Sequence, residues 1–362
     1  MKKSFRQSAA SWLVFIFLSA SLGFAGNTAQ QTPPIKLGTS GSNVKDINAS
    51  FCCTGTLGSL VGNTSGNQYI LSNNHVLARS NAGKPGEVIM QRGYGDTMPA
   101  CSKNGTINVA NLTKFVKLNF TGGNNTVDAA IAKVISGQVS ATGTILQIGT
   151  VSSTTVNPSV GLAVEKSGRT TSKTTGKIGA IKVTATVSGY GPCGLGTNRA
   201  KFVNQFLIKS STFSAAGDSG SLITTQPAAG KKPNPVGLLF AGTSTTTLAN
   251  PINSVLTALG VSLVGLAWAA PMETPMDPEL ERASQVKDRN DDYLLHLPGV
   301  VGHGLSLSQD GSGRPVIVLF LKDTHVPVEN LPTSVEGVLV ETQVTGEFRT
   351  RINCRHSAAK RH

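Results

Sequence analysis

Residues 214–221 read SAAGDSGS, and the Gly-Asp-Ser-Gly within them restricts the fold more than any other part of the chain. A serine that acts as a nucleophile in acyl transfer sits on a tight turn, so that neighbouring N–H groups point at one oxyanion. Gly217 allows backbone torsions closed to other residues, and Gly220 leaves no bulk beside the hydroxyl. We predict Ser219 as the nucleophile and the N–H groups of Gly217 and Ser219 as an oxyanion hole. Taken alone, these four letters also suit an ordinary glycine turn.

The serine needs a base, and residues 26–265 contain one histidine, His75, in ILSNNHVL at residues 70–77. It follows an apolar run and should emerge at a strand end. The base must be held by a carboxylate. Asp128 stands at the head of an apolar strand, where a carboxylate is costly unless it has a partner. We predict His75 as the base and Asp128 as its partner, and we interpret Asp46 and Asp96, in Gly-rich stretches, as solvated turns.

The rest of the chain favours an all-β fold. Of its 362 residues, 40 are glycine and only 14% are charged, and many short β-prone runs alternate with turn residues. No βαβ alternation is visible, so barrels or sandwiches are favoured. The predicted strands cover residues 56–61, 68–71, 127–134, 162–166, 178–187, 200–208, 221–225, 236–241, 300–307, 315–321 and 335–344. The predicted helices cover residues 251–259 and 279–297.

The first residues of the chain are basic and are followed by a short apolar run. This pattern predicts a signal peptide cleaved near Ala25, and therefore a secreted or periplasmic protein. Three prolines within residues 271–278 predict a linker, so that residues 26–270 would fold alone. The predicted segments are a signal peptide (1–25), an extended arm (26–50), a main catalytic domain (51–268), the linker (269–278), a small α+β domain (279–348) and a basic, mobile tail (349–362).

Five cysteines in an exported chain permit disulfides, and the odd count leaves at least one thiol unpaired or bonded between chains. We expect one or two bridges among Cys52, Cys53, Cys101 and Cys193, with the connectivity open. No CxxC or Cys/His cluster suggests zinc. The proposed chemistry requires neither a metal nor a cofactor.

The net charge of +13 is uneven. Residues 26–265 hold 19 Lys and Arg against six Asp and Glu, whereas residues 266–362 hold ten against 13. A basic part of this kind could bind anionic surfaces weakly, but the favoured interpretation is a dispersed, solvated surface. No dense basic run with interleaved aromatic residues appears, so we expect no specific nucleic-acid partner. The oligomeric state stays open.

Three motifs, LSNNHVL, VDAAIA and GDSGS, resemble those of the trypsin-like, chymotrypsin-fold serine proteases, in the same order His, Asp, Ser. KSGRTTSKTTGKI at residues 166–178 and GLLFAGTS at residues 237–244 resemble the narrow-leaf-type plant proteases and their secreted bacterial relatives. The C-terminal part resembles a small accessory domain of such proteins. The resemblance implies two antiparallel β-barrels of the chymotrypsin type, then a small α+β domain, in a secreted serine endopeptidase acting on protein or peptide substrates.

The resemblance also implies a pocket for the side chain before the scissile bond, formed here by Phe213, Phe240, Ala241 and Gly242. These residues belong to the segments Ser210–Ala216 and Phe240–Thr243. Neither segment contains Asp or Glu, which predicts a preference for uncharged, small or apolar residues. The chain lacks the Arg/Lys-Ile-Val-Gly-Gly activation site of the family's zymogens, so Asp218 must be stabilised in another way. Two alternatives stay open: a protease-fold binding or scaffold protein, and an esterase.

Overall fold

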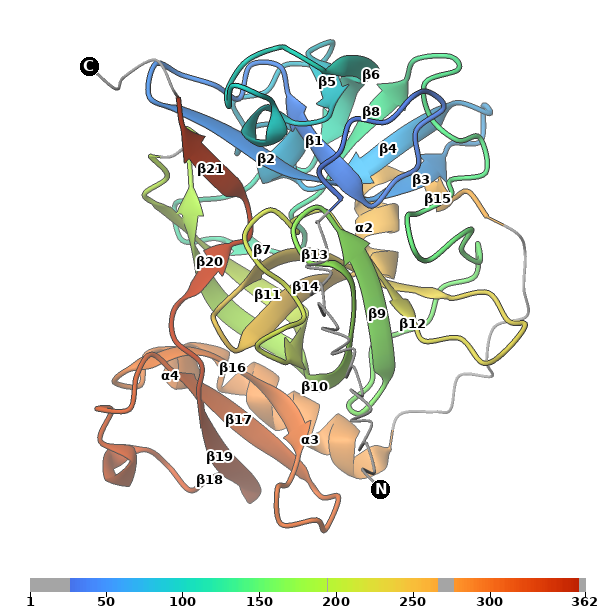
Figure 1. Cartoon of the computed structure of the whole chain (residues 1–362). Helices are drawn as coiled ribbons and strands as arrows, with labels where there is room; N and C mark the ends of the chain where they lie inside the picture. Colours follow the sequence, from blue (N-terminus) through green and yellow to red (C-terminus); the bar gives the residue numbers. More distant parts are fainter. Residues whose placement is uncertain (1–26, 194, 266–276, 358–362) are drawn as a thin grey trace, which may run out of the picture.

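The structure is a computed structural model that describes residues 27–193, 195–265 and 277–357. The predicted signal peptide and most of the predicted linker lie outside these residues. Within them, no helix is both long and apolar enough to cross a membrane. Strands dominate, in two large sheets that are drawn one above the other in Figure 1.

The first barrel is antiparallel and closes on itself. Its strands run in the order β3-β4-β8-β6-β5-β1-β2, and β2 and β3 are halves of one strand bent at Gly58, which closes the ring. A Cβ at Gly58 would lie 1.9 Å from the carbonyl oxygen of Gly220, so the bend packs directly on the turn that carries Ser219. The strands are β1 (Thr39–Asn43), β2 (Phe51–Leu57), β3 (Ser59–Gly62), β4 (Gln68–Ser72), β5 (Val88–Gln91), β6 (Ile107–Phe115) and β8 (Ala130–Val134).

The second barrel is closed by pairing of its two longest strands, β10 and β11. Helix α2 (Ile252–Leu259) forms where a helix was predicted over residues 251–259, and it packs against β13. The strands are β9 (Ala163–Gly168), β10 (Ser172–Tyr190), β11 (Asn198–Lys209), β12 (Leu222–Thr225), β13 (Pro235–Gly242) and β14 (Thr246–Pro251). The prediction of an all-β fold with two antiparallel barrels of the chymotrypsin type is confirmed.

A small α+β part follows, at the bottom of Figure 1. The predicted single helix over residues 279–297 is instead two helices, because Asn290 ends the first and turns its amide back to the carbonyl oxygen of Val286 (2.9 Å). Strand β16 pairs with β10, so this part extends the sheet of the second barrel. Its elements are α3 (Pro278–Arg289), α4 (Asp291–Leu295), β16 (Val300–Leu307), β17 (Pro315–Leu321), β18 (Ser334–Val335) and β19 (Val338–Val344).

Two terminal segments differ from the sequence-based expectations. Residues 26–50 do not form a separate arm, since Ile35 and Leu37 are fully buried and β1 is a central strand of the first barrel. The basic tail is not free either. Its residues form β20 (Phe348–Thr350), which pairs with β10 and β13, and β21 (Asn353–His356), which pairs with β2.

Candidate active site

His75 and Asp128 meet between the barrels. The histidine lies in the short helix α1 (Asn74–Leu77) directly after β4, and Asp128 lies just before β8. His75 Nδ1 is 2.5 Å from Asp128 Oδ2, and the His75 backbone N–H donates to Oδ1 (3.2 Å). Both side chains are buried, so the pair is shielded from water. This carboxylate fixes the ring orientation and leaves Nε2 as the nitrogen available for proton transfer.

Tyr190 is a site residue that the sequence analysis missed. Its hydroxyl donates to Asp128 Oδ2 (2.9 Å), and its ring meets the His75 ring edge-on. Burial, reinforced by the Asp128 charge, raises the pKa of Tyr190 well above its usual value, so the phenol stays protonated and remains a donor. A tyrosine at the end of the long strand β10 carries no motif that would have marked it.

The turn around Ser219 depends on two left-handed glycines. Gly217 has φ +105°, and a Cβ there would lie 2.3 Å from Thr170 Oγ1. Gly220 has φ +95°, and a Cβ there would lie 2.1 Å from Ser72 Oγ. The resulting turn points two N–H groups at one point: those of Gly217 and Ser219 donate to the carbonyl oxygen of Arg351 at 2.5 and 3.2 Å.

The hydroxyl of Ser219 is turned away from the histidine. It donates to the carbonyl oxygen of Phe240 at 3.0 Å. Within the described part of the chain, His75 Nε2 is buried without a hydrogen-bond partner. Ser219 nevertheless lies beside the histidine's helix, because a Cβ on Gly55 would touch both Val76 and the Ser219 carbonyl. The structure therefore places Ser219 near the helix of His75, with no hydrogen bond between the serine hydroxyl and the imidazole among the described residues.

Asp218 is held by partners within the fold. Its carboxylate accepts N–H groups of Thr170 (2.8 Å), Thr171 (3.2 Å) and Ala215 (2.9 Å), and the Lys166 ammonium is 3.5 Å away. Lys166 and Asp218 are both fully buried. Burial lowers the pKa of Lys166, and the Asp218 charge opposes that effect. The KSGRTT segment is thus a structural loop that holds the turn carrying Ser219.

Two aspartates were predicted wrongly as solvated turns. Asp96 receives two hydrogen bonds from the Arg169 guanidinium (2.5 and 2.7 Å), with both side chains nearly buried. Asp46 is also buried, and this burial raises its pKa to about 7, while the Arg79 charge opposes the shift and Glu87 adds to it. Both carboxylates are buried when distant segments pack together, and local glycine content does not reveal that burial.

The residues predicted to form the substrate pocket separate into two groups. Phe240, Ala241 and Gly242 lie on β13, beside the tail strand β20, and the Phe240 carbonyl accepts the N–H of Arg351 (3.0 Å). Phe213 lies in the hydrophobic core of the second barrel, fully buried against Gly176. A cavity of about 170 Å³ adjoins His75, and its lining includes Ile352 and Cys354.

The cysteines form one bridge and one three-sulfur cluster. Cys52 and Cys101 are bonded (2.11 Å). Cys53 Sγ is placed beside two sulfurs, those of Cys193 and Cys354, and is able to bond to either. A cysteine sulfur makes one disulfide at a time, so the third sulfur of the cluster is a thiol. The odd count predicted such a leftover thiol, but the participation of Cys354 was not predicted.

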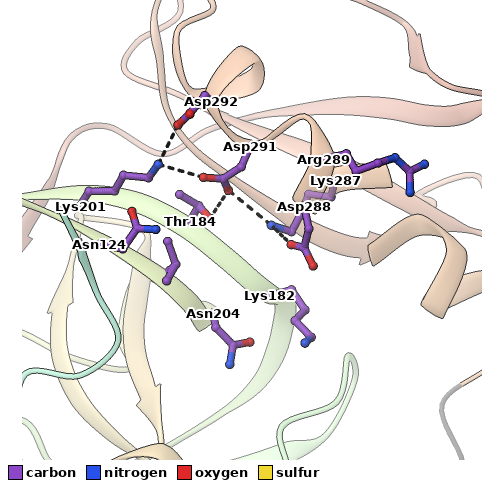
Figure 2. Close-up of a pocket in the computed structure, with 11 residues that line it drawn as sticks. Asn124, Lys182, Thr184, Lys201, Asn204, Lys287, Asp288, Arg289, Asp291 and Asp292 are labelled. Atoms are coloured by element: carbon purple, nitrogen blue, oxygen red, sulfur yellow. Dashed lines mark hydrogen bonds and ion pairs between the residues drawn. The ribbon is translucent and has the colours of Figure 1, made fainter. Parts of the chain in front are cut away.

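A second pocket, of about 430 Å³, lies where α3 and α4 meet β10 and β11, and its lining includes none of His75, Asp128 and Ser219. Figure 2 shows its charges pairing with one another: Lys201 with Asp291 and Asp292 (both 3.0 Å), and the buried Lys287 with Asp288 (2.8 Å) and Asp291. Burial alone would raise the pKa of Asp291, but hydrogen bonds from His303, Thr184 and Lys201 lower it overall. This network attaches the helices to the barrel.

Comparisons with known proteins give the following matches. A family model described as the Nal1 C-terminal domain matches residues 107–251, less than half of the chain. No curated protein matches. A glutamic acid specific serine protease is 20% identical, over 63% of this chain and 100% of that one, with a TM-score of 0.42. Thermobifida fusca protease A is 18% identical, over 64% and 98%, with a TM-score of 0.40, and the Nocardiopsis protease is 19% identical, over 60% and 96%, at 0.39. All three TM-scores are below 0.5, so the description of the site depends on the geometry given above and not on these matches.

Proposed function

We propose that the chain is a secreted serine endopeptidase that cleaves proteins or peptides through His75, Asp128 and Ser219. The observation that carries the proposal is the convergence of the Gly217 and Ser219 N–H groups on one peptide carbonyl oxygen. A site that receives a peptide carbonyl in this way, beside a buried His–Asp pair, suits acyl transfer.

The mechanism follows from these positions. Once rotated toward Nε2, the Ser219 hydroxyl attacks the peptide carbonyl while His75 takes its proton. The Gly217 and Ser219 N–H groups stabilise the negative oxygen, and Asp128 stabilises the imidazolium. His75 then protonates the leaving amine, which yields an acyl-enzyme, and water repeats the sequence to release the acid. Tyr190 holds Asp128 in place, and Phe240–Gly242 lie along the substrate backbone.

The residue requirements involve neither metal nor cofactor. Export is supported by the basic and apolar start of the chain and by its disulfides, which persist in oxidising compartments. A scaffold protein that retains the fold would not need a buried His–Asp pair. An esterase would use the same nucleophile, but the strand-like hydrogen bonds that β13 gives to a peptide favour peptide substrates.

The test combines a fluorophosphonate label with a peptide-library assay on the mature protein. We expect the label on Ser219, and a fall in kcat of about 10⁴–10⁶ in Ser219→Ala and in His75→Ala. Circular dichroism should show an unchanged fold in both variants. Wild-type turnover in either variant would contradict the triad assignment. If Ser219 is labelled and the protein hydrolyses esters but not peptides, the esterase is favoured.

A further inference from the structure

The C-terminal tail crosses from one barrel to the other over the candidate active site. Strand β20 lies against β10 and β13 of the second barrel, and β21 pairs with β2 of the first, with Arg351 and Ile352 between them. Figure 1 shows the two red strands bridging the barrels. The triad lies between these barrels, so the two residues in the middle of the tail lie at the nucleophile.

The backbone of the tail makes the contacts that an extended peptide substrate needs. Thr350 and Arg349 pair antiparallel with Ala241 and Gly242 of β13. The Arg351 N–H donates to the Phe240 carbonyl (3.0 Å), and its own carbonyl oxygen accepts the two N–H groups of the predicted oxyanion hole. Main-chain pairing of this kind is how sheet edges bind peptides. The bond presented to Ser219 is Arg351–Ile352.

The Arg351 side chain is bound as well. Its guanidinium donates to the carbonyl oxygens of Thr243 and Thr246, at the turn between β13 and β14. Its Nε lies 2.9 Å from where a Cβ on Gly242 would be, so only glycine leaves room for it. The expected preference for uncharged residues is not met by the chain's own tail, because carbonyl oxygens take the role that a carboxylate was expected to fill.

The proposed nucleophile is not positioned for attack in this arrangement. The Ser219 hydroxyl donates a hydrogen bond to the Phe240 carbonyl oxygen, which also accepts the Arg351 N–H. His75 Nε2 has no partner among the residues described. The tail therefore fills the oxyanion hole while the attacking group points elsewhere, which suits an inhibitor better than a substrate in turnover.

The three-sulfur cluster lies three residues beyond Arg351. Cys354, on β21, reaches Cys53 on β2, and Cys193 lies beside the same sulfur. All three sulfurs are within 4.8 Å of one another. When Cys193 thiolate attacks Cys53, a Cys53–Cys193 bond forms as the Cys53–Cys354 bond breaks. Cys354 leaves as a thiolate and takes up the proton that Cys193 lost, so no oxidant or reductant is consumed.

We propose that residues 348–356 are a built-in inhibitor of the active site, in which Arg351 occupies the position before the scissile bond and a Cys53–Cys354 disulfide tethers the tail. Exchange to Cys53–Cys193 removes the tether and frees the site. This inference rests on the proposed function, since an inhibitor requires an activity. Loss of the tether lowers the effective concentration of the tail at the site, which links the disulfide to the activity.

The experiment compares full-length variants in two assays, fluorophosphonate labelling of Ser219 and hydrolysis of an unfolded protein substrate. We expect Arg351→Ala and Cys354→Ser to label and cleave at least about tenfold faster than the wild type, a shift of about 1.4 kcal/mol in the occupied fraction. Cys193→Ser, which removes the exchange partner, should be slower than wild type. Arg349→Ala is the matched control, because its side chain is exposed on the same tail, and it should behave as wild type.

A second measurement does not depend on activity. In Ser219→Ala, hydrogen exchange should show a protected Arg351 amide, and adding Arg351→Ala should expose the tail while the barrels stay protected. Equal rates in Arg351→Ala and Arg349→Ala, with Ser219 labelled in both, would overturn the inhibitor and leave the peptidase standing. No labelling in any variant, with a protected tail, would instead overturn the peptidase. If peptide mapping finds Cys53, Cys193 and Cys354 all as free thiols, and metal analysis finds an ion bound to the protein, the disulfide tether is overturned.

Discussion

At the scale of single residues, the contact between His75 and Asp128 was predictable because composition left few alternatives. One histidine in residues 26–265 and one aspartate at the head of an apolar strand singled out His75 and Asp128. Tyr190, Lys166 and Arg351 were not predictable as contacts of the site, because each reaches it from a remote segment. Contacts of these three residues with the site depend on which strands lie side by side in the folded barrels.

Tyr190→Phe tests the third member of the His75–Asp128 contact. The variant keeps the ring against His75 and loses only the hydrogen bond to the Asp128 carboxylate. A bond to a charged acceptor contributes about 1.5–3 kcal/mol, so we expect kcat to fall roughly 10- to 100-fold with KM little changed. The pH–rate profile should shift as well. Tyr94→Phe, which removes a buried hydroxyl bonded to the Val44 carbonyl, is the control, and an equal loss there would indicate a merely structural effect.

Asp46 predicts a pH dependence of stability. Burial raises its pKa to about 7, so the folded chain binds this proton more tightly than the unfolded chain does. The free energy of unfolding should therefore decrease as the pH rises from about 4 to 7, by at most about 1.4 kcal/mol per pH unit. Urea unfolding at pH 5 and 8 should show this loss in the wild type and not in Asp46→Asn. Asp323→Asn, at a more exposed carboxylate, should keep the wild-type slope.

At the scale of elements, the loop between β9 and β10 and the Ser219 turn form one unit. The loop's backbone N–H groups and Lys166 surround Asp218, and the loop's Thr170 hydroxyl donates to the Ala216 carbonyl (2.7 Å). The sequence identified the strands on both sides from their β-prone runs. It could not show that two loops 48 residues apart share one buried ion pair.

Lys166→Met should break this unit. The substitution leaves the Asp218 carboxylate buried without its cation, which costs about 3–5 kcal/mol in the free energy of unfolding. Denaturant unfolding measures the loss, and adding Asp218→Asn should recover part of it. Lys173→Met, which removes a half-exposed partner of Glu165, should cost less than about 1 kcal/mol. A similar cost for both lysines would show that the buried pair is not special.

At the scale of the whole molecule, the sequence predicted the two-barrel class and the small α+β part, but it suggested a boundary at the proline-rich segment. The structure has a continuous core there. Phe206 and Ile178 of the second barrel belong to the same buried cluster as Leu305 and Ile317 of the small part. Pairing between β10 and β16 depends on residues far apart in the sequence, so composition could not predict it.

We therefore expect the second barrel and the α+β part to unfold together. Calorimetry of the full chain should show a single unfolding transition for these two parts. Hydrogen exchange should show β10 and β16 losing protection together, because separating the two strands exposes the shared core. A chain ending at residue 270 should melt at a lower temperature than the full chain. Independent protection of β16 after β10 has exchanged would contradict the shared core.

Because the tail and the candidate active site that it crosses belong to one polypeptide, their encounter is a first-order process. Its equilibrium is set by chain geometry and does not change with protein concentration. Diluting a preparation should leave the active fraction constant, whereas a separate inhibitor would dissociate and release activity. Under the proposed inhibition, dilution alone would not free the site, and only a change at the sulfurs, or at the chain itself, would do so.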